Sequence, residues 1–510
     1  MTAGMGERLP PTASLPSGES VLSEAERRRL TRRPSDRAMI AALTATGLLA
    51  AFMQTIIVPV LPRLPELLDT SVADSQWVLI STLLASAVST PVSGRLGDMY
   101  GKRRMVLVLL AILVAGSLIS ALSFTLIPML VGRVLQGISL GVIALSISVL
   151  RDVIHPKNLP GAVALVSATL GVGGAVGLPI AGMIAENFDW HVLFWAAALT
   201  GVVLFVVVLW IIPVSTLRTA GRFDYLGAVG LMIGLTCLLL AVSKGADWGW
   251  TSAPTLALLV GGAVVLVGWA AYELRHPSPL VDLRVNSRRP VLFTNLSSIT
   301  VGFAFFVTSA TLPVLLEAPT VNGIGLGQPL LITALCLMPS GLMMFFVSPL
   351  AARLSTARGP KTSLVLGSTV IAFAFVLGAL LITEVWHVLL VSTVMGIGVG
   401  FAYAAQPTLI MNSVPATETA AANGLNAVMR TLGSAVSATV VGLILAGSRI
   451  DTPHGPLPTE DAYRTVFVMG AAVVVVGILL ALFIPRRTQA YQHTSSIPII
   501  EAGGEADPRS

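Results

Sequence analysis

Two arginines stand inside long apolar stretches of this sequence, where charged side chains are rare. Arg133 comes about six residues into one stretch, roughly 9 Å along a helix, and Arg430 about ten residues into another. If these stretches cross a membrane, each charge costs about 2.5–3.5 kcal/mol and usually faces a bundle interior or an aqueous cavity. Both arginines are therefore candidates for a functional site, although Arg430 could instead snorkel or pair structurally.

Uncharged polar side chains also interrupt the apolar stretches. Together they could line a central cavity, while each alone could equally make a hydrogen bond between helices; they are Gln54, Thr55, Asn295, Tyr403, Gln406 and Asn426. The apolar surroundings suit an amphiphilic ligand held by burial and a few directional contacts. All 25 acidic residues fall in a tail, in a loop or at the end of an apolar stretch. Glu317 and Asp98 come nearest, so the sequence offers no evident proton site at mid-depth.

Enzyme chemistry has no support in this sequence. It contains no catalytic triad, metal-ligand spacing, nucleotide-binding loop or cofactor motif, and its two cysteines both lie in apolar stretches. The net charge of +6 does not indicate nucleic-acid binding, because the basic residues are spread over short loops and form no single patch. We therefore expect no enzyme activity, no cofactor and no nucleic-acid partner.

The elements that must position these residues are membrane-spanning helices. Of the 510 residues, 55% are hydrophobic and 11% are charged, whereas soluble domains carry about 25% charged residues. A spanning helix needs about 20 apolar residues, and the stretches are too long and too uniform for a β-barrel. We predict fourteen helices, over residues 38–60, 76–96, 105–125, 127–150, 161–184, 191–213, 224–243, 254–273, 291–316, 326–352, 362–382, 386–411, 420–446 and 464–484.

The basic residues predict the orientation of these helices. With the N-terminus inside, 25 of the 31 lysines and arginines fall in the tails and loops of the inner side, four fall outside, and Arg133 and Arg430 lie within helices. Basic residues favour the cytoplasmic side of a membrane. We therefore expect a multi-pass protein of the plasma membrane with both termini cytoplasmic. The polar tails, residues 1–37 and 486–510, are predicted to be disordered.

One short motif occurs twice, each time at an expected inner loop. The first copy, after the second helix, reads Gly94-Arg-Leu-Gly-Asp98-Met-Tyr-Gly101-Lys102-Arg103-Arg104, and a degraded copy after the tenth helix runs from Ala352 to Lys361. One such loop could be a tight basic turn. Two at matching places indicate a repeat of two halves, which is typical of secondary transporters.

The first copy resembles the cytoplasmic loop motif of the major facilitator superfamily at every defining position. The resemblance implies that Asp98 makes a charge–dipole contact with the other half when the protein is closed to the inside. It implies close packing at Gly94 and a sharp turn at Gly101, followed by the basic residues Lys102, Arg103 and Arg104. These residues would then control the change of conformation.

Further motifs resemble the fourteen-helix drug:proton antiporter branch of that family, over residues 38–485. Arg133-Val-Leu-Gln136-Gly137 is similar to its membrane arginine motif, which implies that Arg133 and Gln136 couple protonation to substrate release. The stretch Gly173-Gly-Ala-Val-Gly177-Leu-Pro179-Ile-Ala-Gly182 is similar to its antiporter motif, with Leu178 and Met183 in place of glycines, and implies a conformational role. Arg222-Phe-Asp224-Tyr-Leu-Gly227 begins the first of two linker helices.

The resemblance implies an all-α membrane protein with a major facilitator fold. Its parts would be a six-helix bundle over residues 38–213, two linker helices within residues 214–290, and a second six-helix bundle over residues 291–485. It would export drugs, antibiotics or amphiphilic metabolites by alternating access, with the proton gradient as its source of energy. One chain is expected to suffice for transport, and no cofactor is implied.

One position departs from the branch. Its first helix usually resembles Leu-Asp-x-Thr-Ile-Val, whereas this chain has Phe52-Met53-Gln54-Thr55-Ile56-Ile57-Val58, with Met53 in place of the carboxylate. The sequence therefore does not identify a proton-binding residue, and two buried arginines favour neutral or anionic substrates over dicationic ones. Facilitated diffusion or import by the same fold, and a transport-inactive receptor or scaffold, remain as alternatives.

Overall fold

The computed structural model describes residues 34–214, 217–219, 221–320, 325–452 and 455–485. From Asp36 onward the chain forms one unit, and every element below belongs to it. Most of the first predicted tail and all of the second lie outside the described residues. The first tail is shorter than expected, because Asp36 and Arg37 already belong to a helix.

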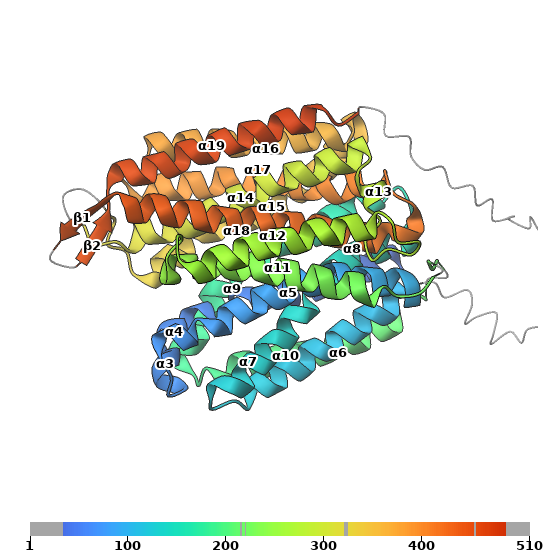
Figure 1. Ribbon diagram of the computed structural model, residues 1–510, viewed down its shortest axis with the longest axis horizontal. Helices are drawn as coiled ribbons and strands as arrows, with labels where there is room; N and C mark the ends of the chain where they lie inside the picture. The colour runs from blue at the N-terminus through green and yellow to red at the C-terminus, as the bar shows by residue number, and fades with distance from the viewer. Residues whose placement is uncertain (1–33, 215–216, 220, 321–324, 453–454, 486–510) are drawn as a thin grey trace, which may run out of the picture. The chain divides into compact units, whose positions relative to one another are not determined.

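The first half of the chain contains six long helical segments (Figure 1). In chain order its elements are α2 (Asp36–Thr55), η1 (Val58–Arg63), α3 (Leu64–Leu67), α4 (Val72–Ser75), α5 (Trp77–Tyr100), α6 (Lys102–Ala121), α7 (Leu126–Ser139), α8 (Val142–Val153), α9 (Leu159–Asn187) and α10 (His191–Ile211). They are followed by the linker helices α11 (Tyr225–Trp248), α12 (Ala253–Glu273) and α13 (Leu283–Asn286).

The second half is built in the same way. Its elements are α14 (Arg289–Glu317), α15 (Leu330–Arg358), α16 (Pro360–Leu380), α17 (Val385–Met411), η2 (Ala416–Glu418), α18 (Thr419–Gly447), β1 (Arg449–Thr452), β2 (Gly455–Pro458) and α19 (Glu460–Leu482). The strands β1 and β2 form an antiparallel hairpin, with Arg449 opposite Pro458, between the last two long helices. The sequence analysis did not anticipate this small addition to a helical protein.

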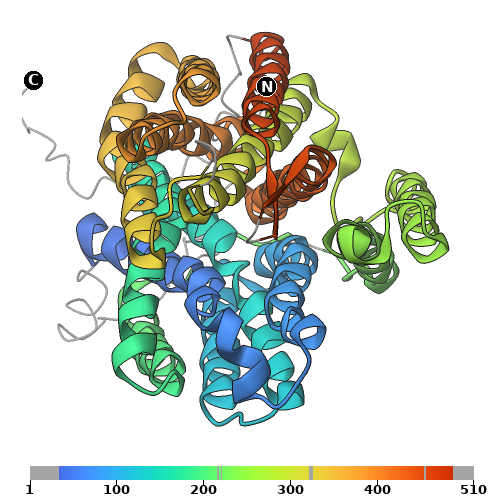
Figure 2. The same ribbon diagram turned by 90° about the vertical axis from the view of Figure 1, so that its left-hand side faces the viewer.

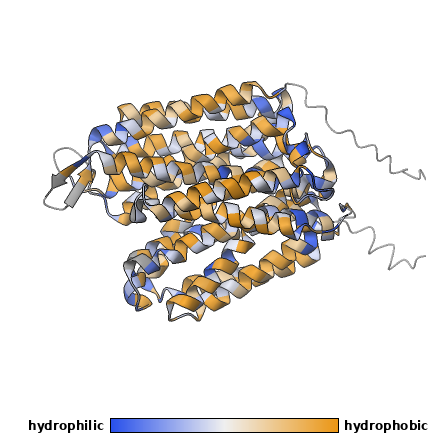
Figure 3. Cartoon of the chain, viewed as in Figure 1, coloured by the Kyte–Doolittle hydropathy of each residue, from blue (hydrophilic) through white to orange (hydrophobic). Residues whose placement is uncertain are grey.

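Fourteen helical segments of the described residues are long and apolar enough to cross a membrane. Apolar residues cover these helices along most of their length, and hydrophilic residues gather toward their ends (Figure 3). The predicted number of spans is confirmed, and this chain is a multi-pass membrane protein.

Two of the predicted helices are interrupted. The first was expected to run to residue 60, but its α-helix ends at Thr55 and a 3-10 helix continues from Val58, because Pro59 and Pro62 lack the N–H groups that an α-helix needs. The fourth was expected to be continuous, but it divides into α7 and α8, and the Leu140 N–H bonds to the Gly137 carbonyl three residues back. Both interruptions lie next to residues that the sequence analysis selected.

The repeated motif is helical, which corrects its assignment to a loop. The first copy covers the last two turns of α5 and the first residues of α6, and the second covers the end of α15 and the first residues of α16. In each copy one glycine makes the turn to the next helix, with φ of 107° at Gly101 and 88° at Gly359. Only glycine adopts such angles without strain. The two halves therefore share this corner in backbone conformation as well as in sequence.

Each half has its own hydrophobic core. One core is built almost entirely from α2 to α10 and the other from α14 to α19. The halves meet where α9 packs on α15 and where α5 packs on α18. The linker helices α11 and α12 pack on each other at the side of the bundle, and α11 also contacts α5 and α18 (Figure 2).

Candidate functional site: the central cavity and the contacts between the halves

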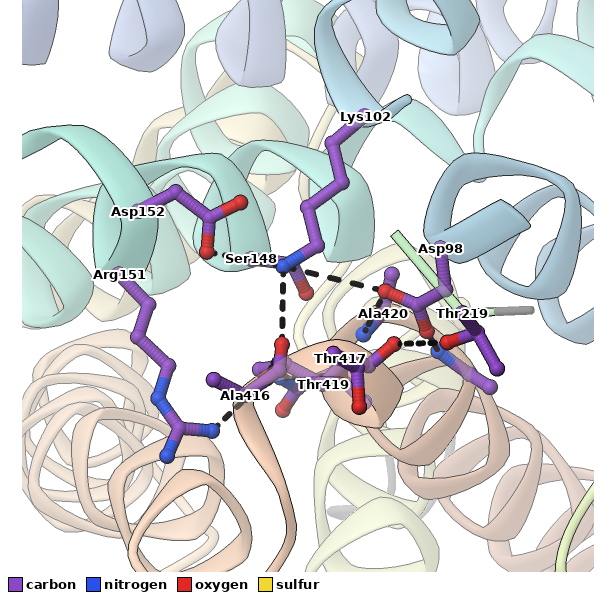
Figure 4. Close-up of polar contacts among 12 residues, drawn as sticks. Asp98, Lys102, Ser148, Arg151, Asp152, Thr219, Ala416, Thr417, Thr419 and Ala420 are labelled. Atoms are coloured by element: carbon purple, nitrogen blue, oxygen red, sulfur yellow. Dashed lines mark hydrogen bonds and ion pairs between the residues drawn. The ribbon is translucent and has the colours of Figure 1, made fainter. Parts of the chain in front are cut away.

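Asp98, at the end of α5, caps a helix of the other half. Its two carboxylate oxygens accept hydrogen bonds from the N–H groups of Ala420 and Ala421, at 3.3 and 2.9 Å, in the first turn of α18 (Figure 4). The N-cap residue of α18, Glu418, provides no side-chain cap of its own. A carboxylate at this place satisfies N–H groups that have no partner within the helix and also favours the helix dipole. The charge–dipole contact implied for Asp98 is present in this structure.

Lys102 connects the same two halves one turn further along the chain. Its ammonium group lies 2.9 Å from the Asp152 carboxylate and 3.8 Å from that of Asp98, and it donates to the Ala416 carbonyl at 3.2 Å. The side chains of all three charged residues are at most 2% exposed. The Lys102 ammonium bridges the two carboxylates, and the Asp98 carboxylate faces the start of α18, where the helix dipole is positive.

Arg151 and Thr219 add further bonds that the sequence analysis missed. Arg151 donates to the Val414 carbonyl and to the Thr419 hydroxyl, and Thr219 donates its hydroxyl hydrogen to the Thr417 carbonyl. The backbone N–H of Thr219 bonds to the Asp98 carbonyl at 2.8 Å. In the sequence, Arg151 was only one of the basic residues assigned to the inner loops, and Thr219 belongs to no motif that indicates a function. Together with Asp98 and Lys102 they form what we call the latch (Figure 4).

Gly94 allows the latch to close. A Cβ atom at this position would lie 2.6 Å from the Ala420 carbonyl oxygen, which is closer than real side chains approach. The backbone of α5 therefore meets the first turn of α18 directly. The side-chain hydrogen bonds by which Asp98, Lys102 and Arg151 join the two halves all lie in this latch region.

The basic residues after Gly101 have different surroundings. Arg103 donates to the Leu209 carbonyl at the end of α10, whereas Arg104 is exposed. In the second half, Lys361 donates to the carbonyls of Leu482 and Ile484 at the end of α19. Arg103 and Lys361 occupy equivalent repeat positions, so each ties the third helix of its half to the sixth. These bonds hold each half together.

A cavity of about 490 Å³ lies between the halves. Four residues that the sequence selected line it, namely Gln54, Tyr403, Asn426 and Arg430. Its apolar wall comes from residues of α5, α8, α9 and α14, and its polar wall from α17 and α18. The linker helix α11 also contributes, through Leu239, Val242 and Ser243. This last contribution was not anticipated, because nothing in the sequence shows where a linker helix packs.

The polar wall is a connected chain of side chains. Asn426 donates to the Asn295 side-chain oxygen at 2.9 Å and to the Ser298 hydroxyl at 2.7 Å. Arg430 donates to the Asn426 side-chain oxygen at 3.1 Å, and its guanidinium carbon lies 4.9 Å from the centre of the Tyr403 ring. Asn295 therefore fixes the Asn426 side chain without lining the cavity itself. Asn426 and Tyr403 in turn hold the Arg430 guanidinium at the cavity wall.

Arg133 is fully buried and does not line this cavity. Its guanidinium donates to the backbone carbonyls of Val78 and Met53, at 3.1 and 3.0 Å, and to the Gln136 side chain at 2.8 Å. Gln136 in turn donates to the Ser117 hydroxyl, which lies 4.0 Å from the Met53 sulfur. Met53, which stands where the branch has a carboxylate, thus lies in the same polar cluster as Arg133.

The other selected residues lie apart from the cavity lining. Gln406 is buried, and its amide has no hydrogen-bond partner among the described residues. Thr55 donates to the Gly173 carbonyl, at 3.4 Å, where Gly173 and Gly177 of α9 pack against α2. Glu317 is exposed at the last position of α14. Pro179 lies inside α9, and no neighbour approaches the place of a Cβ on Gly182.

The fold consists of two six-helix halves with a polar-walled cavity between them, and the repeated motif lies at one end of each half. A sequence model of the Major Facilitator Superfamily matches residues 43–438. The chain belongs to the Major Facilitator Superfamily. It is therefore a membrane transporter and not an enzyme.

Relatives in this superfamily are named for drug resistance. The lincomycin resistance protein LmrB of Listeria monocytogenes is 26% identical over 88% of this chain and 96% of its own length. The tetracenomycin C resistance and export protein of Streptomyces glaucescens is 27% identical over 79% of this chain and 75% of its own length. The crystal structure of the human organic anion transporter MFSD10 has the same fold, with a TM-score of 0.63 and 16% identity over 88% of this chain and 100% of that one.

Proposed function

We propose that this Major Facilitator Superfamily transporter exports amphiphilic small molecules across the plasma membrane in exchange for protons. The observation that carries the proposal is a cavity between the halves combined with a polar latch at one end of the bundle. Alternating access requires a central site and a closure that can open and re-form. Because both halves of one chain line the cavity, we propose a monomer as the transport unit.

The distribution of basic residues supports a cytoplasmic position for the latch and for both termini. On this assignment the structure is closed toward the cytoplasm. To receive substrate from the cytoplasm, the protein would have to break the bonds from Asp98 to α18 and the ion-pair group around Lys102. The latch residues Asp98, Lys102, Arg151 and Thr219 would then act on the conformational equilibrium and not on the substrate. The motif glycines Gly94 and Gly101 would act in the same way, by allowing the close contact and the turn.

Proton exchange supplies enough energy for export. One proton that crosses 100 mV releases about 2.3 kcal/mol, which corresponds to a concentration gradient of roughly 50-fold. Drug export is supported by the names of the relatives, which include lincomycin and tetracenomycin C. We propose Arg133 and Gln136 as coupling residues, because Arg133 bonds to the Met53 carbonyl of α2, next to the cavity residue Gln54, and Gln136 accepts a bond from Arg133.

The test is uptake of radiolabelled tetracenomycin C into energised inverted membrane vesicles that contain the protein. We expect uptake above that of vesicles without the protein, and we expect a protonophore to abolish it. Uptake that persists unchanged with the protonophore would reject proton exchange in favour of facilitated diffusion. An Arg133→Ala variant that folds and transports at the normal rate would reject its coupling role.

A further inference from the structure

We propose that the central cavity binds amphiphiles through an anionic group, such as a carboxylate or a sulfonate, held by Arg430; this rests on the proposed function and specifies its substrate class. The proposal begins with the charges of the lining. Among the described residues that line the cavity, Arg430 carries the only formal charge, and the others are apolar or uncharged polar residues. The cavity is therefore positively charged before any substrate enters.

The charge of Arg430 is not neutralised by its contacts. Within the described part of the chain, its guanidinium makes one hydrogen bond, to the neutral Asn426 side chain, and one ring contact, with Tyr403. A guanidinium has five N–H donors in a planar fork that matches a carboxylate or sulfonate. Arg430 can thus keep its bond to Asn426 and still offer a pair of donors to an anionic ligand.

The surroundings hold Arg430 in one place. The bonds that Asn426 makes to Asn295 and Ser298 fix the side-chain oxygen that accepts from Arg430. The Tyr403 ring packs against the guanidinium and is itself only 5% exposed. Because this side chain is already ordered, an anion loses less entropy on binding than it would at a mobile surface arginine.

The opposite wall suits the apolar part of the same molecule. Leu79, Leu83 and Leu84 of α5 and Ile143 and Ile147 of α8 face the cavity, and Phe305 and Phe306 of α14 adjoin the polar wall. A volume of about 490 Å³ falls within the range of drug-sized ligands. A molecule with one anionic end and an apolar body would place its charge on α18 and its body against α5 and α8.

Cationic amphiphiles face the opposite situation. They would enter a low-dielectric cavity that already holds one positive charge, and no lining residue described by the structure is acidic. Like charges repel more strongly beside protein walls than in bulk water, because the effective dielectric constant is lower there. The cavity therefore discriminates by the sign of the charge as well as by size and hydrophobicity.

The experiment compares three probes with one apolar body and different charges. Equilibrium binding of tritiated 2-naphthylacetate, 2-naphthylacetamide and 2-(2-naphthyl)ethylammonium is measured on the full-length protein in nanodiscs. We expect the carboxylate to bind about 10- to 100-fold more tightly than the amide, as for other charge-assisted hydrogen bonds. The ammonium probe is expected to bind more weakly than the amide.

Variants then assign the preference to Arg430. Arg430→Gln is expected to bring the carboxylate and the amide to about equal affinity, while Arg430→Lys retains the charge and part of the preference. Arg464→Gln is the matched control, because Arg464 lies on α19 in an exposed pair with Glu460 and should leave the preference unchanged. If Arg430→Gln does not fold, the wild type and Arg430→Lys still decide the outcome.

The outcomes separate this inference from the proposed function. Equal binding of the carboxylate and the amide, or tighter binding of the ammonium probe, overturns the inference and leaves export of amphiphiles standing. A carboxylate preference that persists in Arg430→Gln also overturns it. Binding of none of the three probes counts against both, because the cavity then fails as a site for amphiphiles of any charge.

Discussion

At the scale of single residues, the Asp98 carboxylate belongs to one half and completes the first turn of a helix in the other. Asp98→Asn removes the charge and one acceptor, so the N–H groups of Ala420 and Ala421 should open more often. We expect their amide hydrogen exchange to accelerate about tenfold, as fits the loss of about 1–2 kcal/mol of dipole and hydrogen-bond energy.

The repeat provides the control for this measurement. Thr356 occupies the equivalent position on α15, where its hydroxyl donates to the Ala352 carbonyl of its own helix. Thr356→Ala should therefore leave exchange at the start of α18 unchanged. Equal exchange at Ala420 and Ala421 in Asp98→Asn and in the wild type would contradict the capping role.

Met53 offers a second test at the residue scale. Its sulfur lies in the polar cluster of Arg133, whose Nη2 atom has no hydrogen-bond partner among the described residues. In Met53→Asp the new carboxylate could pair with this guanidinium, so we expect a folded and monodisperse protein. Leu43→Asp, at an equally buried site of the same helix, should fail to fold, because an unpaired buried charge costs several kcal/mol.

Size-exclusion profiles and thermal unfolding in detergent compare the two aspartate variants directly. If both variants lose the folded state equally, the Arg133 cluster cannot accommodate a carboxylate.

The polar residues of the cavity and of the Arg133 cluster were recognisable from the sequence, since arginines and amides inside apolar stretches are rare. The sequence could not predict that these residues separate into a group around Arg430 at the cavity and a buried group around Arg133. The rotation of each helix about its axis decides which side chains face a cavity.

At the scale of helices, the close approach of α9 and α15 depends on a small residue. A Cβ on Gly341 would lie 2.2 Å from the Gly171 carbonyl oxygen and 2.3 Å from the Ala175 Cβ. Gly341→Ala should therefore force the two helices apart and lower the midpoint of thermal unfolding by several degrees, at a cost of about 1–3 kcal/mol.

Gly442→Ala is the matched control on α18, where no atom would meet a new Cβ. This substitution should leave the unfolding midpoint unchanged or raise it, because alanine favours a helix by about 1 kcal/mol over glycine. If Gly341→Ala is as stable as Gly442→Ala, the contact between α9 and α15 adjusts freely.

Helix positions followed well from the sequence because hydrophobic length is a strong signal. The failures have local causes. Prolines ended the α-helical part of the first span. At the break between α7 and α8, Ser89 of α5 donates to the Ile138 carbonyl and Gly137 packs directly on α5, contacts that the sequence does not show. The repeated motif was assigned to a loop because its charges suggest solvent, yet Asp98 and Lys102 are buried by the other half.

At the scale of the whole molecule, the two halves could be expected from the repeat, but the position of the linker helices could not. Linker residues need only an apolar surface, which fits many places on a bundle. In the structure α11 lies along α5 and α18, and Leu239, Val242 and Ser243 reach the cavity lining. The linker is therefore part of the wall of the cavity and more than a connection between halves.

Ser243→Trp tests this position of α11. The indole would extend into the cavity and occupy part of its volume of about 490 Å³, so binding of naphthylacetate and transport should fall about tenfold or more. Val264→Trp on α12 is the control, because Val264 is 65% exposed and outside the cavity lining. Both variants should have the same unfolding midpoint, so that a selective loss of binding in Ser243→Trp reports occlusion of the cavity. Equal binding by the two tryptophan variants would mean that α11 moves away from the cavity when substrate binds.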